Sequence, residues 1–296
     1  MFRGTGTALI TPFRDGAVDF DALADLLNFQ VESGVDALIV LGTTGEAATM
    51  TPAERDAVIS FAVETVAGRL PIIIGTGTNC TMTTIDLSRR AEELGADGVL
   101  IVTPFYNKPN QEGLYQHFKA AAESVGIPVI LYNVPGRTGC NMLPETVLRL
   151  TAVPNIVGVK EASGNQYQCD SLIRSLALVR PDFHVYSGND DQAFHLVCAG
   201  GDGVISVLSN VMPAQVAAMM NAALGGDLAT ARELHLRMLP LMKDLFTESN
   251  PMPVKFAVSE LGLCRDEVRL PLVPACEKTR EIVRADMLEL DLLEDE

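Results

Sequence analysis

Short apolar runs alternate with amphipathic stretches through the first three quarters of the chain. An apolar run of this length, bounded by turn residues, is typical of a buried strand. Eight such runs predict strands at residues 5–10, 37–41, 71–75, 98–102, 128–132, 156–160, 183–187 and 203–206. Apolar residues at helical spacing between the runs predict helices, for example at residues 21–33, 81–94, 113–125 and 190–199.

Regular alternation of strand and helix predicts parallel strands joined by right-handed crossovers. Eight units favour a closed (β/α)₈ TIM barrel over a doubly wound open sheet, which usually has fewer strands. Thr51, Pro52 and Glu54 are spaced as a helix start with a capping box. Strand signals stop near residue 227, and helical patterns follow at residues 227–248, 253–261 and 274–290. We therefore expect a catalytic barrel over residues 1–226 and a C-terminal helical region over residues 227–296.

Composition narrows the class of protein. The chain has 296 residues, is 48% hydrophobic and carries a formal net charge of −16. A field of that sign repels nucleic acid and anionic membrane surfaces, so neither is an expected partner. The six cysteines are scattered without metal or disulfide spacing, which predicts reduced thiols. We find no basic and apolar leader and no apolar run long enough to cross a membrane, and we therefore expect a cytoplasmic protein.

Lys160 ends the apolar run at residues 156–160. At the carboxyl end of a buried strand, desolvation disfavours the ammonium, and the pKa falls from about 10.4 toward values at which a free amine attacks carbonyls. The alternative is a snorkelling lysine or an ion pair with Glu161, because lysine is rarely buried. The neighbouring motifs decide between these interpretations.

Polar residues also follow three of the other predicted strands. Residues 42–46 read Gly-Thr-Thr-Gly-Glu, a turn that can present backbone N–H groups to a carboxylate. Tyr106 lies on a proline-flanked loop, Tyr132 ends the fifth strand, and Arg137 follows it. Taken singly, a tyrosine at such a position is more often a core aromatic, and an arginine is more often a solvated surface charge. Because active sites of such barrels lie at the carboxyl ends of the strands, their gathering around Lys160 favours an amine catalyst.

Other chemistries fit the sequence poorly. The four histidines have no metal-ligand spacing, and residues 75–80 lack the last glycine of a dinucleotide-binding fingerprint. No P-loop is present. We therefore expect an enzyme that uses no metal and no cofactor.

In this order and spacing, residues 42–46, 132–138, 158–163 and 203–206 resemble the dihydrodipicolinate synthase family of the pyruvate-dependent class I aldolases. The resemblance runs from residue 1 to about residue 290 and includes the Asn-Pro-Met-Pro-Val-Lys motif at residues 250–255. It implies a lyase of lysine (diaminopimelate) biosynthesis that condenses pyruvate with L-aspartate 4-semialdehyde to 4-hydroxy-tetrahydrodipicolinate through a Schiff base.

The resemblance also implies residue roles. Lys160 forms the Schiff base, and Tyr132 transfers protons through a relay with Thr43 and with Tyr106, which enters from a neighbouring subunit of a homotetramer, a dimer of dimers. Four further residues are expected to bind substrate: Thr44 at the pyruvate carboxylate, Gly188 and Ile205 on the far side, and Arg137 at the semialdehyde carboxylate.

Two alternatives remain at this point. N-acetylneuraminate lyase and the sugar-acid aldolases share the lysine and the tyrosine. However, they lack the Arg137–Thr138 pair and commonly have serine at the position of Thr43. A catalytically silent paralogue that binds a keto acid is the second alternative, although every predicted chemical residue is present.

Feedback by lysine is expected to be weak or absent. In strongly inhibited family members, two histidines, a glutamate and a tyrosine contact the lysine ligand. The matching positions hold Pro52, Arg55, Thr83 and Phe105, while Asn79 is retained. A cation in place of histidine and a threonine in place of the carboxylate remove attraction for an ammonium ligand.

Overall fold

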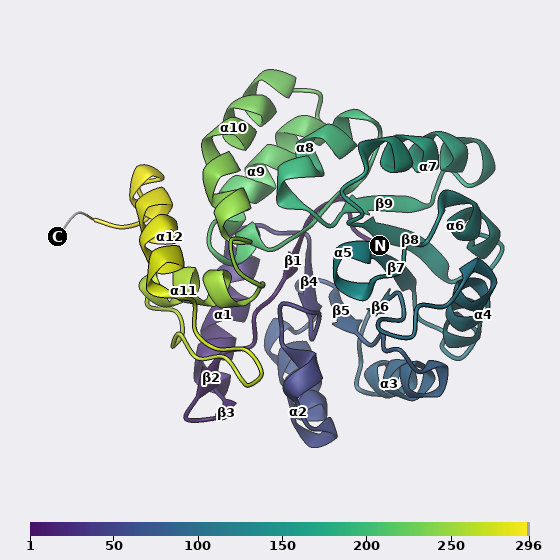
Figure 1. Cartoon of the computed structure of the whole chain (residues 1–296), viewed down its shortest axis with the longest axis horizontal. Helices are drawn as coiled ribbons and strands as arrows, with labels where there is room; N and C mark the ends of the chain where they lie inside the picture. Colours follow the sequence, from purple (N-terminus) through teal and green to yellow (C-terminus); the bar gives the residue numbers. More distant parts are fainter. Residues whose placement is uncertain (295–296) are drawn as a thin grey trace.

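The computed structural model describes residues 1–294 and shows eight parallel strands closed into a barrel with helices around it (Figure 1). The strand order is β1-β10-β9-β8-β7-β6-β5-β4, and β1 closes the barrel by pairing with β4. The predicted TIM barrel is confirmed, with every strand within two residues of its expected position. The strands are β1 (Gly4–Ala8), β4 (Ala37–Val40), β5 (Ile72–Gly75), β6 (Gly98–Val102), β7 (Val129–Asn133), β8 (Ile156–Glu161), β9 (His184–Ser187) and β10 (Gly203–Ser206).

The hairpin of β2 (Phe13–Arg14) and β3 (Ala17–Val18) was not predicted. Two residues are too few to show an alternating pattern, so the sequence gives no strand signal there. The hairpin lies outside the barrel, and it contacts the C-terminal region described below.

The barrel helices are α1 (Phe20–Glu32), α2 (Pro52–Val66), α3 (Thr81–Glu93), α4 (Gln111–Ala122), α5 (Pro135–Thr138), α6 (Pro144–Leu150), α7 (Gln166–Val179), α8 (Asp190–Cys198) and α9 (Pro213–Leu224), with 3₁₀ turns η1 (Ala47–Thr49) and η2 (Leu208–Asn210). The four barrel helices predicted by range lie within three residues of their expected bounds, α2 begins at its predicted start, and the other barrel helices were not predicted. The predicted capping box is present: the Glu54 amide donates to Thr51 Oγ1, and the Thr51 amide donates to Glu54 Oε2. In the described part of the chain no helix has the length and apolar character to cross a membrane.

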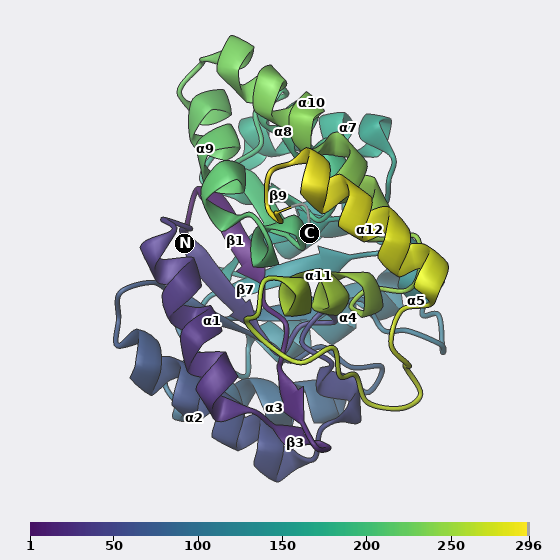
Figure 2. The ribbon, with the colours of Figure 1, turned by 90° about the vertical axis from the view of Figure 1, so that its left-hand side faces the viewer.

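The C-terminal region forms α10 (Leu228–Asp244), α11 (Met252–Glu260) and α12 (Glu277–Glu289). Helix α12 packs on both α10 and α11, and Figure 2 shows α11 and α12 on one side of the molecule. Phe256 and Val283 belong to the same apolar cluster as the outer faces of the barrel strands. The helical region is therefore joined to the barrel by one continuous core. Residues 295 and 296 of this predicted region lie outside the described residues.

Side chains along each strand alternate between two apolar layers. Leu131 and Val159 point outward to the helices, whereas Tyr132 belongs to the cluster inside the barrel. At the amino-terminal end, Phe2 stacks on Tyr186 with ring centroids 4.4 Å apart. This stack fills the base of the barrel and leaves the carboxyl-terminal end for the site.

Candidate active site

A cavity of about 480 Å³ lies at the carboxyl ends of the strands. Its walls combine strand ends, the loops that follow them and the segment before α11. Six of the residues predicted from the sequence line it: Thr43, Thr44, Tyr132, Arg137, Lys160 and Gly188. The structure thus brings most of the predicted site together.

Lys160 lines this cavity and is the register partner of Tyr132 on the adjacent strand. Its side chain is 5% exposed, and its Nζ lies 4.4 Å from the centroid of the Tyr132 ring. Burial lowers the pKa of Lys160 to about 7, an effect that the carboxylate of Asp190 opposes and the Arg137 charge reinforces. A substantial fraction of the amine is therefore uncharged at neutral pH, as expected for a nucleophile.

Glu161 does not neutralise Lys160, because consecutive strand residues face opposite sides of the sheet. Its carboxylate accepts hydrogen bonds from Asn133 Nδ2 at 3.1 Å, Gln168 Nε2 at 3.2 Å and the Ser163 amide at 2.7 Å. These partners lie outside the barrel interior. The alternative that Lys160 forms an ion pair with Glu161 is therefore wrong.

Lys255 is the second buried lysine, and its surroundings are quite different. Its Nζ lies 2.6 Å from Glu46 Oε1, donates to the Glu267 carbonyl at 2.7 Å and sits 4.0 Å from the Phe13 ring centroid. Breaking a buried pair of this kind costs about 3–5 kcal/mol, because the remaining charge is left without compensation. Lys255 is thus held by a buried ion pair, whereas Lys160 forms no ion pair with any of the described residues.

Gly188 leaves the space that the Lys160 side chain occupies. A Cβ added at Gly188 would lie 2.6 Å from Ala162 Cβ and 3.0 Å from Lys160 Cε. Its amide donates to the Glu161 carbonyl at 2.8 Å, which fixes the loop after β9 against β8. A larger residue at this position would clash with Ala162 and crowd the lysine stem.

The loop after β4 holds Thr44 against the cavity. A Cβ at Gly45 would lie 3.2 Å from backbone atoms of Leu41 and Leu9, so the turn packs closely on the strand ends. Thr44 is buried, and its Oγ1 accepts a hydrogen bond from Asn250 Nδ2 at 2.9 Å. The threonine hydroxyl therefore has a fixed orientation at the cavity wall.

Arg137 enters the cavity from α5, the short helix that follows β7. The helix begins at Pro135, and the Thr138 hydroxyl donates to the Val134 carbonyl at 3.1 Å. Arg137 Nη2 donates to the backbone carbonyl of Asn250 at 3.2 Å. The guanidinium thus supplies a local cation for an anionic ligand in a chain of strongly negative net charge.

Tyr132 is suited to hold a proton rather than to lose one. Burial raises its pKa to about 12, while the Arg137 charge opposes this rise. The phenol is therefore neutral across the physiological range and can donate a hydrogen bond or proton to a reacting oxygen or carbon.

Two predicted site residues do not line this cavity. Tyr106 is 88% exposed on the loop after β6, with a backbone φ of 73°. Ile205 is fully buried in the apolar cluster inside the barrel, to which Tyr186 also belongs. A single subunit therefore does not complete the relay of Thr43, Tyr132 and Tyr106, which stays a prediction that requires a second subunit.

Several site residues were missed by sequence reasoning. The C-terminal region closes the cavity with Phe246, Ser249, Asn250, Pro251 and Leu272. The Asn-Pro-Met-Pro-Val-Lys motif was the available signal, although its spacing alone assigns no contact. Asp190 was also missed: its Oδ2 accepts from the Val207 and Leu208 amides, and burial raises its pKa.

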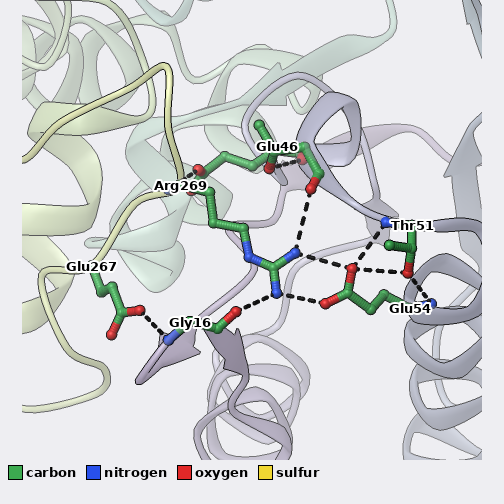
Figure 3. A network of polar contacts seen from close by, with 7 residues as sticks. Gly16, Glu46, Thr51, Glu54, Glu267 and Arg269 are labelled. Carbon is green, nitrogen blue, oxygen red and sulfur yellow. Dashed lines mark hydrogen bonds and ion pairs between the residues drawn. The ribbon is translucent and has the colours of Figure 1, made fainter.

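A polar network joins the cavity loop to the C-terminal region (Figure 3). The Arg269 guanidinium donates to Glu54 Oε1 and to the Gly16 carbonyl, each at 2.6 Å. Its backbone amide donates to Glu46 Oε2 at 3.0 Å. The β2–β3 hairpin, the loop after β4 and the segment before α12 are therefore held as one unit behind Thr44.

Comparison with known proteins gives one consistent result. The model of the dihydrodipicolinate synthetase family matches residues 1–290. The 4-hydroxy-tetrahydrodipicolinate synthase of Kosmotoga olearia is 60% identical over 293 residues, which is 99% of this chain and 100% of that protein.

Solved structures agree with this. The dihydrodipicolinate synthase of Thermotoga maritima superimposes with a TM-score of 0.98 at 51% identity, covering 99% of this chain and 100% of that one. The dihydrodipicolinate synthase of Acinetobacter baumannii, solved in complex with pyruvate, gives a TM-score of 0.96 at 42% identity, with 99% and 100% covered.

Proposed function

The chain belongs to the dihydrodipicolinate synthetase family, and we propose that its barrel cavity condenses pyruvate with L-aspartate 4-semialdehyde to 4-hydroxy-tetrahydrodipicolinate. The observation that carries this proposal is Lys160, a buried amine that faces the cavity with a pKa lowered to about 7. The reaction is a step of lysine biosynthesis, and the enzyme is a lyase of the class I aldolase type.

The first half of the reaction takes place on pyruvate. The uncharged Lys160 amine adds to the ketone, and loss of water gives a protonated Schiff base. This cation draws electrons from the methyl group, which loses a proton and becomes an enamine. The Tyr132 hydroxyl, on the neighbouring strand, is the group that exchanges these protons.

The second half joins the two substrates. The enamine carbon adds to the aldehyde carbon of L-aspartate 4-semialdehyde, and the aldehyde oxygen takes a proton that Tyr132 delivers. The amine of the semialdehyde then displaces Lys160 as the ring closes, which regenerates the free lysine. Thr43 and a partner subunit's tyrosine, equivalent to Tyr106, extend the proton path from Tyr132 to solvent.

Two groups bind the substrate carboxylates in this proposal. Thr44 and the amides of its loop hold the pyruvate carboxylate next to Lys160. Arg137 holds the carboxylate of the semialdehyde, because a guanidinium binds a carboxylate through two parallel hydrogen bonds. Gly188 keeps the opposite wall open, and Ile205 supports the floor from the inner cluster.

The assembly is part of the proposal. We expect a homotetramer built as a dimer of dimers, because Tyr106 is exposed in one subunit and has no role in that subunit's own cavity. Aromatic side chains are enriched at interface centres. We also expect the enzyme in the cytoplasm, where its unpaired cysteines stay reduced.

A coupled assay tests the proposed function. The purified chain is supplied with pyruvate and L-aspartate 4-semialdehyde, and consumption of the product by the downstream reductase is followed. We expect turnover, and its loss in Lys160→Ala. Cleavage of N-acetylneuraminate without condensation would indicate the sister lyase, and pyruvate binding without any turnover would indicate a silent paralogue.

A further inference from the structure

One residue of the C-terminal region contacts two groups proposed to bind substrate. Asn250 Nδ2 donates to Thr44 Oγ1 at 2.9 Å, and the Asn250 backbone carbonyl accepts from Arg137 Nη2 at 3.2 Å. Asn250 is 5% exposed and lies at the cavity wall. A segment outside the barrel thus connects the loop after β4 to helix α5.

The direction of the bond between Asn250 and Thr44 determines what the threonine can do. A hydroxyl has one hydrogen to donate and two lone pairs that accept. Because Thr44 accepts from the Asn250 amide, its own hydrogen stays available. An ionised carboxylate only accepts, so a hydroxyl that binds it must donate. The reverse arrangement would occupy the Thr44 hydrogen and remove that donor.

A second contact holds the same two segments together. Lys255 lies five residues after Asn250, and its partner Glu46 lies two residues after Thr44. The two charged side chains are 0% and 1% exposed and are 2.6 Å apart. The Arg269 amide donates to the other Glu46 oxygen, as Figure 3 shows. This buried pair keeps the Asn250 amide at a fixed distance from the Thr44 hydroxyl.

We propose that Asn250 is a positioning residue that fixes the Thr44 hydroxyl as a donor to the pyruvate carboxylate. This inference rests on the proposed function, in which Thr44 binds pyruvate. Asn250 takes no part in proton transfer at Lys160. Its replacement should therefore weaken pyruvate binding far more than it slows the reaction at saturating pyruvate.

Two substitutions separate positioning from a structural role. Asn250→Asp keeps the shape of the side chain but replaces the donor with an anionic acceptor, which takes the Thr44 hydrogen and repels the pyruvate carboxylate. Asn250→Ala only removes the donor. If Asn250 positions Thr44, pyruvate binding should be weaker in Asn250→Asp than in Asn250→Ala. If Asn250 has only a structural role, pyruvate binding should be weaker in Asn250→Ala, because alanine leaves a gap and aspartate does not.

The readout is the pyruvate concentration that gives half-maximal trapping of the Schiff base at Lys160 by borohydride at pH 8. We expect this concentration to rise about tenfold in Asn250→Ala, as for the loss of a charge-assisted hydrogen bond. In Asn250→Asp it should rise at least about tenfold further, because the carboxylate also repels pyruvate. In a Thr44→Val background, Asn250→Ala should have no further effect, because the two residues act through one contact.

Asn155→Asp is the matched control. Its Nδ2 donates to the carbonyls of Ala122 and Val125 at 2.8 and 3.0 Å, at the amino-terminal end of β8 and away from the cavity. Its pyruvate dependence should stay within about twofold of the unaltered chain.

Equal half-saturation in Asn250→Asp and Asn250→Ala, or values unchanged from the unaltered chain, would overturn the positioning role. If Asn250→Asp does not fold, Asn250→Ala decides, because an unchanged value for that variant contradicts the proposal. Absence of trapping at Lys160 in the unaltered chain would instead refute the proposed function itself.

Discussion

Tyr132 and Lys160 face each other from adjacent strands, with the lysine Nζ 4.4 Å from the centroid of the tyrosine ring. Burial acts on the two groups in opposite directions, since it lowers the pKa of Lys160 to about 7 and raises that of Tyr132 to about 12. A free amine and a neutral phenol therefore coexist at neutral pH. That combination places a nucleophile beside a proton donor.

Replacing Tyr132 with phenylalanine should separate proton transfer from packing. The ring and its contact with Lys160 remain, while the hydroxyl that exchanges protons is lost. We expect kcat to fall by about 10²–10³-fold, within the range of general acid–base contributions. Steady-state rates with both substrates measure this, with thermal unfolding as the control for the fold. A kcat within about threefold of the unaltered enzyme would contradict the role of Tyr132.

Gly188→Ala should impair the reaction through the position of Lys160. The added methyl group would lie 2.6 Å from Ala162 Cβ and 3.0 Å from Lys160 Cε, so Ala162 must shift and the lysine stem is crowded. Because a misplacement of about 1 Å at a reacting group costs on the order of 10²-fold in rate, we expect a loss of activity that does not exceed this size. Gly136→Ala is the matched control, because a Cβ there meets nothing within 4 Å. Equal activity of the two variants in the coupled assay would show that Gly188 does not shape the site.

Lysine at millimolar concentration should inhibit weakly or not at all. Arg55 stands at a position that the family resemblance assigns to the lysine site, and its guanidinium is held by the Ala47 carbonyl at 2.5 and 3.1 Å, so it would repel an ammonium ligand there. Thr83 is exposed and brings no carboxylate. Rates at fixed substrate concentrations and rising lysine measure the effect, and half-inhibition below one millimolar would show that this prediction is wrong.

Mixed subunits test whether Tyr106 serves the neighbouring site. Lys160→Ala and Tyr106→Phe should each be nearly inactive as pure oligomers. In a mixed dimer, the Tyr106→Phe subunit keeps its lysine and receives an intact tyrosine from its partner, so one working site is restored. Co-expression with two affinity tags isolates this species. Activity no higher than that of the pure variants would place Tyr106 in its own subunit or outside the reaction.

The sequence was sufficient to predict the barrel and the strand positions of Tyr132 and Lys160, for a physical reason. Strands of a parallel barrel are buried on both faces, so they appear as continuous apolar runs whose ends are easy to locate. The order of the runs then made β7 and β8 neighbours, which predicted that Tyr132 and Lys160 would meet. Gly188 could be assigned only through the family resemblance, because a glycine shows its role only when its neighbours are known.

The contacts that the sequence did not predict join segments far apart in the chain. Asn250 and Thr44 are separated by 206 residues, and no local pattern pairs them. Lys255 appeared only as the last residue of a motif, and its pairing with Glu46 depends on how α11 packs against the barrel. Ile205 lies near the end of β10, yet it belongs to the apolar cluster inside the barrel and does not line the cavity.

The pH dependence of Schiff-base formation follows from the lowered pKa of Lys160. Only the uncharged amine attacks a ketone, so the rate should rise with pH through about 7 and then level off. A lysine of ordinary pKa would give a rate that keeps rising to about pH 10.4. The ionisation of pyruvate does not change over this range, so the pH profile of the rate reflects the ionisation of Lys160.

Mapping the reduced pyruvate adduct tests the central claim most directly. The chain is incubated with pyruvate and borohydride across this pH range, digested and analysed by mass spectrometry. The account predicts a single adduct on Lys160, formed at half its maximal rate near pH 7 and absent in Lys160→Ala. An adduct on Lys255 or any other lysine, or no adduct at all, would contradict it.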